Sequence, residues 1–122
     1  MKFYRNTQAE LNTNLSRHFK LKEFRCKCGQ CRLTWVDPEL NMRLEVLRRL
    51  VKKPLYILSG YRCQEHNRNT VGSAEYSYHM TGQAVDLKPP KEDLEGFVAN
   101  CKMLFNFVIV TGAYIHVDVG QR

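Results

Sequence analysis

The chain has 122 residues, a length that suits one domain with a single hydrophobic core. Hydrophobic residues make up 43% of the sequence and charged residues 25%, which excludes an intrinsically disordered chain. The net charge of +7 favours contact with a polyanion, such as nucleic acid, an anionic membrane or an anionic cell-wall polymer, but it does not select among them.

Residues 1–14 form a polar N-terminal lead-in, and a single domain is expected over residues 15–122. The lead-in lacks the apolar centre of a secretory signal, so we expect synthesis in the cytoplasm without a signal peptide, and any export would need another route. No segment approaches the roughly 20 apolar residues of a membrane span. Basic residues form no uninterrupted tail and no nucleic-acid-binding motif, so a solvated basic surface is favoured over specific nucleic-acid binding.

The first half of the domain predicts one long helix. A short helical turn over residues 15–24 precedes it, pinned by Phe19, Leu21 and Phe24. The helix runs from Pro38 to about Lys53, because Asp37 is a suitable N-cap and Pro54 ends the run. Its apolar residues recur at helical spacing and predict a buried stripe of Leu40, Leu44, Leu47, Leu50 and Val51.

The second half predicts short strands and a second long helix. Residues 55–58 indicate a buried strand, residues 64–68 a short helix and residues 83–87 another strand. The second helix spans residues 91–105, and two apolar runs, residues 107–110 and 114–119, form a closing hairpin. The inward residues of that helix are Leu94, Phe97, Val98, Cys101 and Leu104 or Phe105. The fold class is α+β, with a small, mostly antiparallel sheet packed with two main helices.

Five cysteines, an odd number, argue against a complete disulfide framework. Cys26, Cys28 and Cys31 lie close together, and Cys28-x-x-Cys31 has the spacing of a metal-binding pair. A structural metal site would need a fourth ligand from Cys63, Cys101 or a histidine. Because the usual second ligand pair is absent, the sequence favours reduced, partly buried thiols over a structural metal site.

The most informative segment is residues 77–86, which carries His79 and Asp86 and is followed thirty residues later by His116. Two imidazoles and a carboxylate suit one zinc ion, and three such ligands leave the fourth tetrahedral position open, as in catalytic sites. On a strand, alternate residues share a face, so His116 lies on the same face as Tyr114 and Asp118. The same alternation turns Asp86 away from the core.

The motif S-x-H-x-x-G-x-A-x-D over residues 77–86, with the later His116, resembles the zinc D-alanyl-D-alanine carboxypeptidase and L-alanyl-D-glutamate endopeptidase family. The fold of that family is shared with the signalling domain of hedgehog proteins. The likeness extends from about Leu15 to Gly120 and is greatest to small single-domain members, including phage lysins. It also includes the segments LSRHF (15–19), EF (23–24), SGYR (59–62), HN (66–67), VG (71–72) and IHVDV (115–119).

The resemblance implies that His79, Asp86 and His116 hold one Zn²⁺ ion per chain. It also implies that Arg62 faces the negative charge that develops on the scissile carbonyl, a role that suits a permanently charged guanidinium. The residues proposed to orient a ligand or to contact substrate are Ser77, Tyr114 and His66.

The general base is the position where the sequence departs from the family. Many relatives place an acidic residue three positions before the last histidine ligand, and here that position is Ala113. Asp118 is the nearest carboxylate, and we expect it to take the proton of the attacking water. In the alternative role Asp118 fixes the His116 ring, and Glu65 and Glu75 remain candidate bases from loops.

The resemblance thus implies a zinc peptidase, a carboxypeptidase or an endopeptidase, that cleaves the stem peptide or cross-link of bacterial peptidoglycan. A basic monomer suits that anionic wall. The favoured biology is a phage or prophage endolysin that reaches the cell wall through another factor, ahead of a bacterial wall-remodelling enzyme. Two other classes stay open: a catalytically silent zinc-containing binding module of the same fold, and a basic nucleic-acid-binding domain with a structural metal.

Overall fold

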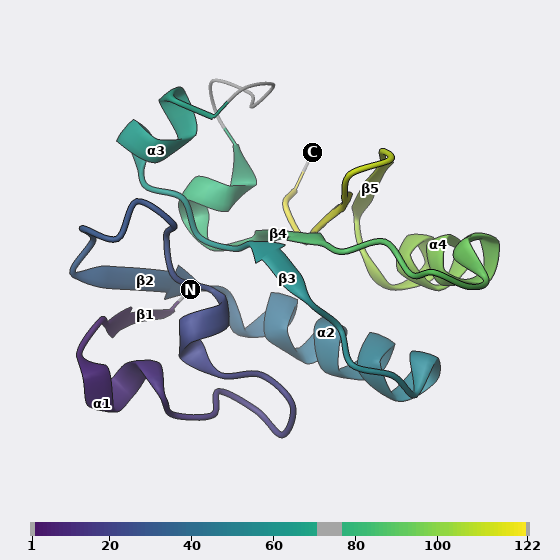
Figure 1. Ribbon diagram of the computed structural model, residues 1–122, viewed down its shortest axis with the longest axis horizontal. Coiled ribbons are helices and arrows are strands. Elements are labelled where there is room, and N and C mark those ends of the chain that lie inside the picture. Colours follow the sequence, from purple (N-terminus) through teal and green to yellow (C-terminus); the bar gives the residue numbers. More distant parts are fainter. Residues whose placement is uncertain (1, 71–76, 122) are drawn as a thin grey trace.

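The computed structural model describes residues 2–70 and 77–121 (Figure 1). Strands and helices are interspersed along the chain, and all strand pairs are antiparallel. The strands are β1 (Lys2–Arg5), β2 (Leu33–Val36), β3 (Ile57–Ser59), β4 (Ala84–Leu87), β5 (Phe107–Val110) and β6 (Ile115–Asp118). The helices are α1 (Gln8–Leu11), α2 (Pro38–Val51), α3 (Gln64–Arg68) and α4 (Leu94–Leu104), and the 3-10 turns are η1 (Leu21–Glu23) and η2 (Tyr78–Thr81). The α+β class predicted from the sequence is confirmed.

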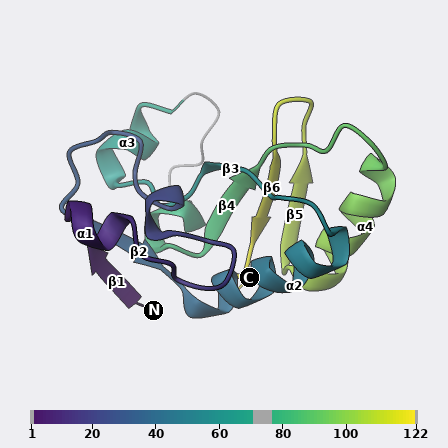
Figure 2. The same cartoon turned by 60° about the horizontal axis from the view of Figure 1, so that its bottom comes forward.

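The main sheet has the order β3-β4-β6-β5, which places the last strand of the chain beside β4. The expected closing hairpin forms between β5 and β6, and β6 then pairs with β4 (Figure 2). In that pairing Asp86 lies opposite His116, and Ala84 lies opposite Asp118. The sheet therefore brings two segments thirty residues apart into direct register.

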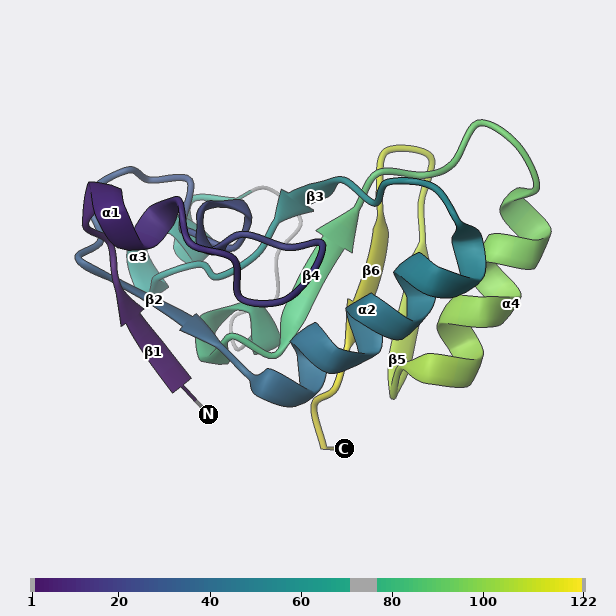
Figure 3. The same cartoon turned by 90° about the horizontal axis from the view of Figure 1, so that it is seen from below.

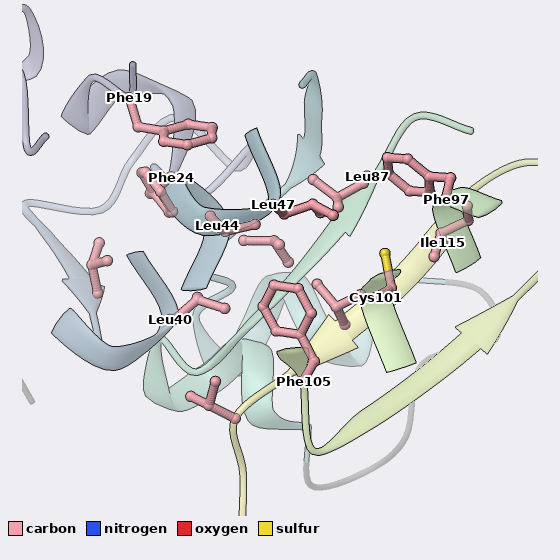
Figure 4. Packing of buried hydrophobic residues seen from close by; sticks show 14 of the residues in the cluster. Phe19, Phe24, Leu40, Leu44, Leu47, Leu87, Phe97, Cys101, Phe105 and Ile115 are labelled. Atoms are coloured by element: carbon pink, nitrogen blue, oxygen red, sulfur yellow. The ribbon is translucent and has the colours of Figure 1, made fainter. Parts of the chain in front are cut away.

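Helices α2 and α4 lie side by side across one face of this sheet (Figure 3). The apolar residues of β6, Ile115 and Val117, are completely buried, and Ile115 lies close to Phe97 and Cys101 of α4 (Figure 4). Helix α2 contributes Leu40, Leu44 and Leu47 to the same cluster. Because strand side chains alternate, this packing commits the odd-numbered residues of β6 to the core and leaves His116 and Asp118 for the opposite face.

Helix α2 begins where the sequence predicts. The Asp37 carboxylate accepts a hydrogen bond from the N–H of Glu39, and Pro38 occupies the first helical position. The helix ends at Val51 rather than about Lys53, because Lys52 adopts a left-handed conformation with φ of 60°. The prediction that Leu50 is buried is wrong, since its side chain is 46% exposed. At 100° per residue it lies about 60° beyond the edge of the stripe.

Helix α4 begins at Leu94, three residues after the predicted start, because Asp93 is the N-cap and accepts from the N–H of Gly96. Phe97 and Cys101 are buried as expected, but Leu94 occupies the first turn and is 44% exposed. The strand expected over residues 55–58 is shifted to β3, and the expected burial is wrong, since Tyr56 and Leu58 are 60% and 42% exposed. The carbonyl of Tyr56 accepts a hydrogen bond from the N–H of Lys88, but this bond lies just outside the regular pairing of β3 with β4.

The predicted lead-in contains structure that the sequence analysis missed. Strand β1 pairs with β2 as a separate two-stranded sheet, in which the Phe3 and Trp35 rings pack at a tilt of 53° with their centroids 5.1 Å apart. This small sheet and α1 lie at the end of the molecule far from α4 (Figure 2). Three of the four β1 residues are exposed, so the strand carries no alternating pattern that a sequence reading would detect. Among the described residues, no helix combines the length and the apolarity needed to cross a membrane.

Candidate metal centre

Three side chains from η2, β4 and β6 converge on the face of the sheet opposite α2 and α4. One ligand atom from each of His79, Asp86 and His116 lies within 4.8 Å of the other two. Asp86 Oδ1 is 3.1 Å from His79 Nε2 and 3.0 Å from His116 Nδ1. The trio predicted from the sequence is therefore brought together, and its two nitrogens and one oxygen suit zinc.

The turn η2 places His79 at the base of this group. The Ser77 hydroxyl caps η2 by accepting a hydrogen bond from the N–H of His79, at 3.1 Å. Gly82 ends the turn with φ of 73°, and a Cβ there would lie 2.4 Å from the carbonyl oxygen of Trp35. The chain must therefore turn through glycine to enter β4 directly after the first ligand. Ser77 acts on His79 through the backbone, which fits the ligand-orienting role expected for it.

Each imidazole uses its outer nitrogen to fix the orientation of the ring. The Nδ1–H of His79 donates to the carbonyl oxygen of Gly60 at 2.7 Å, and the Nε2–H of His116 donates to Asp118 Oδ2 at 2.8 Å. Because a carbonyl and a carboxylate only accept, each outer nitrogen keeps its proton when the ring is neutral, which leaves the inner nitrogen free to bind a metal. This is the arrangement that histidine ligands have around protein-bound metals. The residues therefore fit a zinc ion with His79 Nε2, His116 Nδ1 and Asp86 as its protein ligands. In the metal-free protein the inner nitrogens instead face Asp86 Oδ1 and donate to it when the rings are protonated.

The electrostatics of the trio keep Asp86 ionised. Burial opposes the charge, but hydrogen bonds from His116 and His79 outweigh it and hold the pKa of the Asp86 carboxyl well below its usual value. Burial likewise disfavours protonation of His116, yet its hydrogen bonds to Asp118 and Asp86 raise its pKa above the ordinary value. A carboxylate and two fixed rings thus form a cluster that attracts positive charge, from protons or from a metal ion.

Arg62 lies beside this cluster with its charge buried. Its side chain is 7% exposed, and its Nε makes no hydrogen bond to any residue in the described part of the chain. Burial lowers the pKa of the guanidinium, and the nearby Asp86 and Tyr114 partly offset that effect. Its backbone N–H donates to the carbonyl of His79 at 3.0 Å. A buried donor of this kind is suited to hold an anionic group of a bound substrate or transition state.

The comparison with protein families agrees with this geometry. A family model described as Peptidase M15 matches residues 17–118, a range that contains all three ligands and Arg62. The chain belongs to the peptidase M15 family. No curated protein shows a significant match to it. Members of the M15 family are zinc-dependent peptidases, so the resemblance seen in the sequence is confirmed at the level of the family and of the metallopeptidase class.

In this M15 peptidase Asp118 lies behind the His116 ring. Its side chain has no exposed surface, its Oδ2 accepts from His116, and its Oδ1 accepts from the N–H of Gly120 at 3.2 Å. The bonded nitrogen of His116 is the one that faces away from Asp86 and His79. This geometry favours the alternative role of Asp118, in which it fixes the ring, over the predicted role of general base.

The remaining candidate residues of this M15 peptidase are Tyr114, His66, Glu65 and Glu75. Tyr114 is half-buried directly before β6 and lies close enough to Arg62 to influence its pKa. His66 is half-buried on α3, and Glu65 on the same helix is exposed. Glu75 lies outside the described residues. Sequence reasoning missed the carbonyl of Gly60, because a backbone acceptor leaves no mark in the residue type.

Proposed function

We propose that this M15 peptidase hydrolyses peptide bonds in the stem peptide or cross-link of bacterial peptidoglycan. The observation that carries the proposal is the convergence of two oriented imidazoles and one carboxylate beside a buried guanidinium. Three protein ligands leave room for one more at a tetrahedral ion. When bound there, zinc would supply an activated water and polarise the scissile carbonyl.

The side chains of this protein would divide the remaining work. Gly60 and Asp118 hold the two imidazoles in fixed tautomers, and Arg62 stabilises the negative charge that develops on the carbonyl oxygen. Stem peptides carry free carboxylates. The Arg62 guanidinium could therefore bind either a carboxylate of the substrate before reaction or the oxyanion that develops during it. The net charge of +7 favours approach to an anionic wall.

We propose that the general base is a carboxylate other than Asp118, since both oxygens of Asp118 are engaged at the back of the His116 ring. The two other candidate bases are Glu65 and Glu75. Glu65→Gln and Glu75→Gln test them separately. The base is identified by a variant that keeps its zinc and its affinity for substrate but loses turnover.

The test of the activity uses purified protein, purified peptidoglycan and mass spectrometry of the released fragments. We expect fragment release with zinc, loss of release after chelation, and recovery when zinc is restored. The masses identify the bond, and thus distinguish a D,D-carboxypeptidase from an L-alanyl-D-glutamate endopeptidase or a cross-link endopeptidase. The absence of any fragment from zinc-loaded protein would overturn the proposal.

A second candidate is a catalytically silent zinc-containing module that binds peptidoglycan. Ala113 favours it, because many relatives carry an acid at that position, and so does the engagement of Asp118. Co-sedimentation with insoluble peptidoglycan separates the two candidates. A silent module would sediment with the wall and release nothing, whereas the enzyme releases soluble peptides.

The biological setting is a further part of the proposal. We propose that the protein acts on the cell wall as a monomeric endolysin of a phage or prophage, with a bacterial wall-remodelling enzyme as the alternative. Light scattering during size-exclusion chromatography tests the monomer. Rapid clearing of a cell suspension by added protein would support a lytic role, and slow trimming without lysis would support remodelling.

A further inference from the structure

The fold brings four of the five cysteines into a second cluster, separate from the His79 centre. One Sγ atom from each of Cys26, Cys28, Cys31 and Cys63 lies within 4.8 Å of the others. None of these four thiols is in a disulfide. Cys101, the fifth, is buried in the core between α4 and the sheet (Figure 4). Cys63 is therefore the residue that can serve as the fourth ligand beside Cys26, Cys28 and Cys31.

The distances between the sulfur atoms are those of a tetrahedral metal site. The Sγ of Cys28 lies 3.4 Å from that of Cys31 and 3.9 Å from that of Cys63, and Cys26 lies 3.8 Å from Cys63. A zinc ion with four Zn–S bonds of about 2.3 Å requires sulfur atoms roughly 3.8 Å apart. A disulfide requires about 2.05 Å. The four thiols thus surround a volume of about the size that one zinc ion requires.

Backbone N–H groups point at the sulfur atoms from both segments. Gln30 N–H donates to Cys28, Cys63 N–H to Cys26, and His66 N–H to Cys63, each at 3.4 Å. Such donors stabilise the thiolate, the form that binds metal. The turn between Cys28 and Cys31 passes through Gly29 with φ of 75°, which frees the backbone to wrap around the ion.

We propose that Cys26, Cys28, Cys31 and Cys63 bind one structural zinc ion. Four thiolates fill the tetrahedron and leave no open position, so this second zinc takes no part in hydrolysis. The sequence favours free, reduced thiols only because it shows no second ligand pair beside Cys28 and Cys31. The structure supplies that pair from Cys26 and Cys63, which are 37 residues apart.

The site ties together two segments that support the His79 centre. Tyr61 N–H donates to the carbonyl of Phe24 at 2.8 Å, and the Gly60 backbone packs directly on Phe24. Gly60 in turn holds His79, and Arg62 directly precedes Cys63. A zinc ion that joins Cys63 to residues 26–31 would therefore hold Gly60 and Arg62 in place. This consequence depends on the proposed function, whereas the metal site itself does not.

Zinc content of purified protein, measured by elemental analysis, tests the site. We expect two zinc ions per chain in the wild type and one in the double variant Cys28→Ser/Cys31→Ser. His116→Ala should also retain one, and the control Cys101→Ala should retain both. One zinc in the wild type that persists in Cys28→Ser/Cys31→Ser would overturn the proposal, while leaving the His79 centre intact.

Two measurements that do not use the double variant keep the test decisive if that variant does not fold. X-ray absorption at the zinc edge of His116→Ala should show four sulfur neighbours at about 2.3 Å and no nitrogen or oxygen. Thiol titration of wild-type protein, unfolded with chelator and without reductant, should give all five thiols. A count of one, the number left by two disulfides, would contradict the site, as would a zinc shell of nitrogen and oxygen.

Discussion

Asp86 of β4 lies directly opposite His116 of β6, with its Oδ1 3.0 Å from His116 Nδ1. The same ring uses its other nitrogen to donate to Asp118, two residues further along β6. One imidazole thus connects a carboxylate that fits a metal ligand to a carboxylate that is completely buried. The function assigned to each acid follows from which side of the ring it occupies.

Asp118→Asn should weaken zinc binding rather than abolish catalysis outright. The amide keeps a weaker acceptor for His116 but loses the charge that orients the ring, so we expect zinc affinity at the His79 centre to fall about 10- to 100-fold. Competition with a chelating dye measures this affinity, and saturating zinc should restore much of the activity. Unchanged affinity with no turnover at saturating zinc would instead identify Asp118 as the general base.

Arg62→Lys should lower turnover without removing metal. A lysine keeps the charge but loses the forked donor, so we expect kcat to fall by about 10²- to 10³-fold while zinc content stays at the wild-type value. Steady-state kinetics on a soluble stem peptide measure the effect. Arg68→Lys, on the exposed face of α3, is the matched control and should behave as wild type. Equal kinetics for both variants would exclude Arg62 from the site.

The stability of metal-free protein should depend on pH through His116 and Asp86. Burial lowers the pKa of His116, but its hydrogen bonds to Asp118 and Asp86 outweigh that effect and raise it. The resulting contribution of His116 to the free energy of unfolding is complete below about pH 6.5, and it is lost as the pH rises through the raised pKa. The lowered pKa of Asp86 gives a contribution that is present above about pH 3.9 and lost as the pH falls through the lowered value.

Chelated protein should therefore be most stable between about pH 4 and 6.5. Asp86→Asn removes one partner of the pair, so its melting temperature should change less with pH on both sides of that window. Thermal unfolding of the two chelated proteins across the pH range provides the comparison. If the melting temperatures of the two proteins change in parallel with pH above 6.5, the His116–Asp86 pair does not contribute to stability.

Gly82→Ala should destabilise the fold and disturb the first ligand. The added Cβ would meet the Trp35 carbonyl oxygen at 2.4 Å in a backbone with φ of 73°. We expect the free energy of unfolding to fall by at least about 2 kcal/mol, as measured by denaturant titration. Gly112→Ala is the control, because a Cβ there has no neighbour within 4 Å, and it should be nearly neutral. Equal stability of the two variants would contradict the packing of η2 against β2.

The metal ligands could be predicted from the sequence because each occupies a position with a strong local rule. Strand alternation alone assigns His116 and Ile115 to opposite faces, and the apolar run around His116 decides which face is the core. The turn at Gly82 separates His79 from β4 in a way that a glycine in a polar segment already indicates. Local periodicity therefore carried most of the information about the trio.

The role of Asp118 could not be decided in the same way. Alternation places it on the face of His116, but whether it touches the metal side or the back of the ring depends on the rotamer of the imidazole. Similarly, Cys63 joins Cys26 only through the packing of Gly60 on Phe24, a contact between backbones far apart in the chain. Features set by tertiary packing cannot be predicted from the spacing of residues along the sequence.

The most direct test of the metallopeptidase account compares wild-type protein with His116→Ala on purified peptidoglycan, with zinc content and released peptides measured on the same samples. The account predicts that the variant folds, contains one zinc ion fewer per chain and releases no peptide, while the wild type releases peptides of defined mass. Peptide release by His116→Ala at the wild-type rate, or an unchanged zinc content, would contradict it.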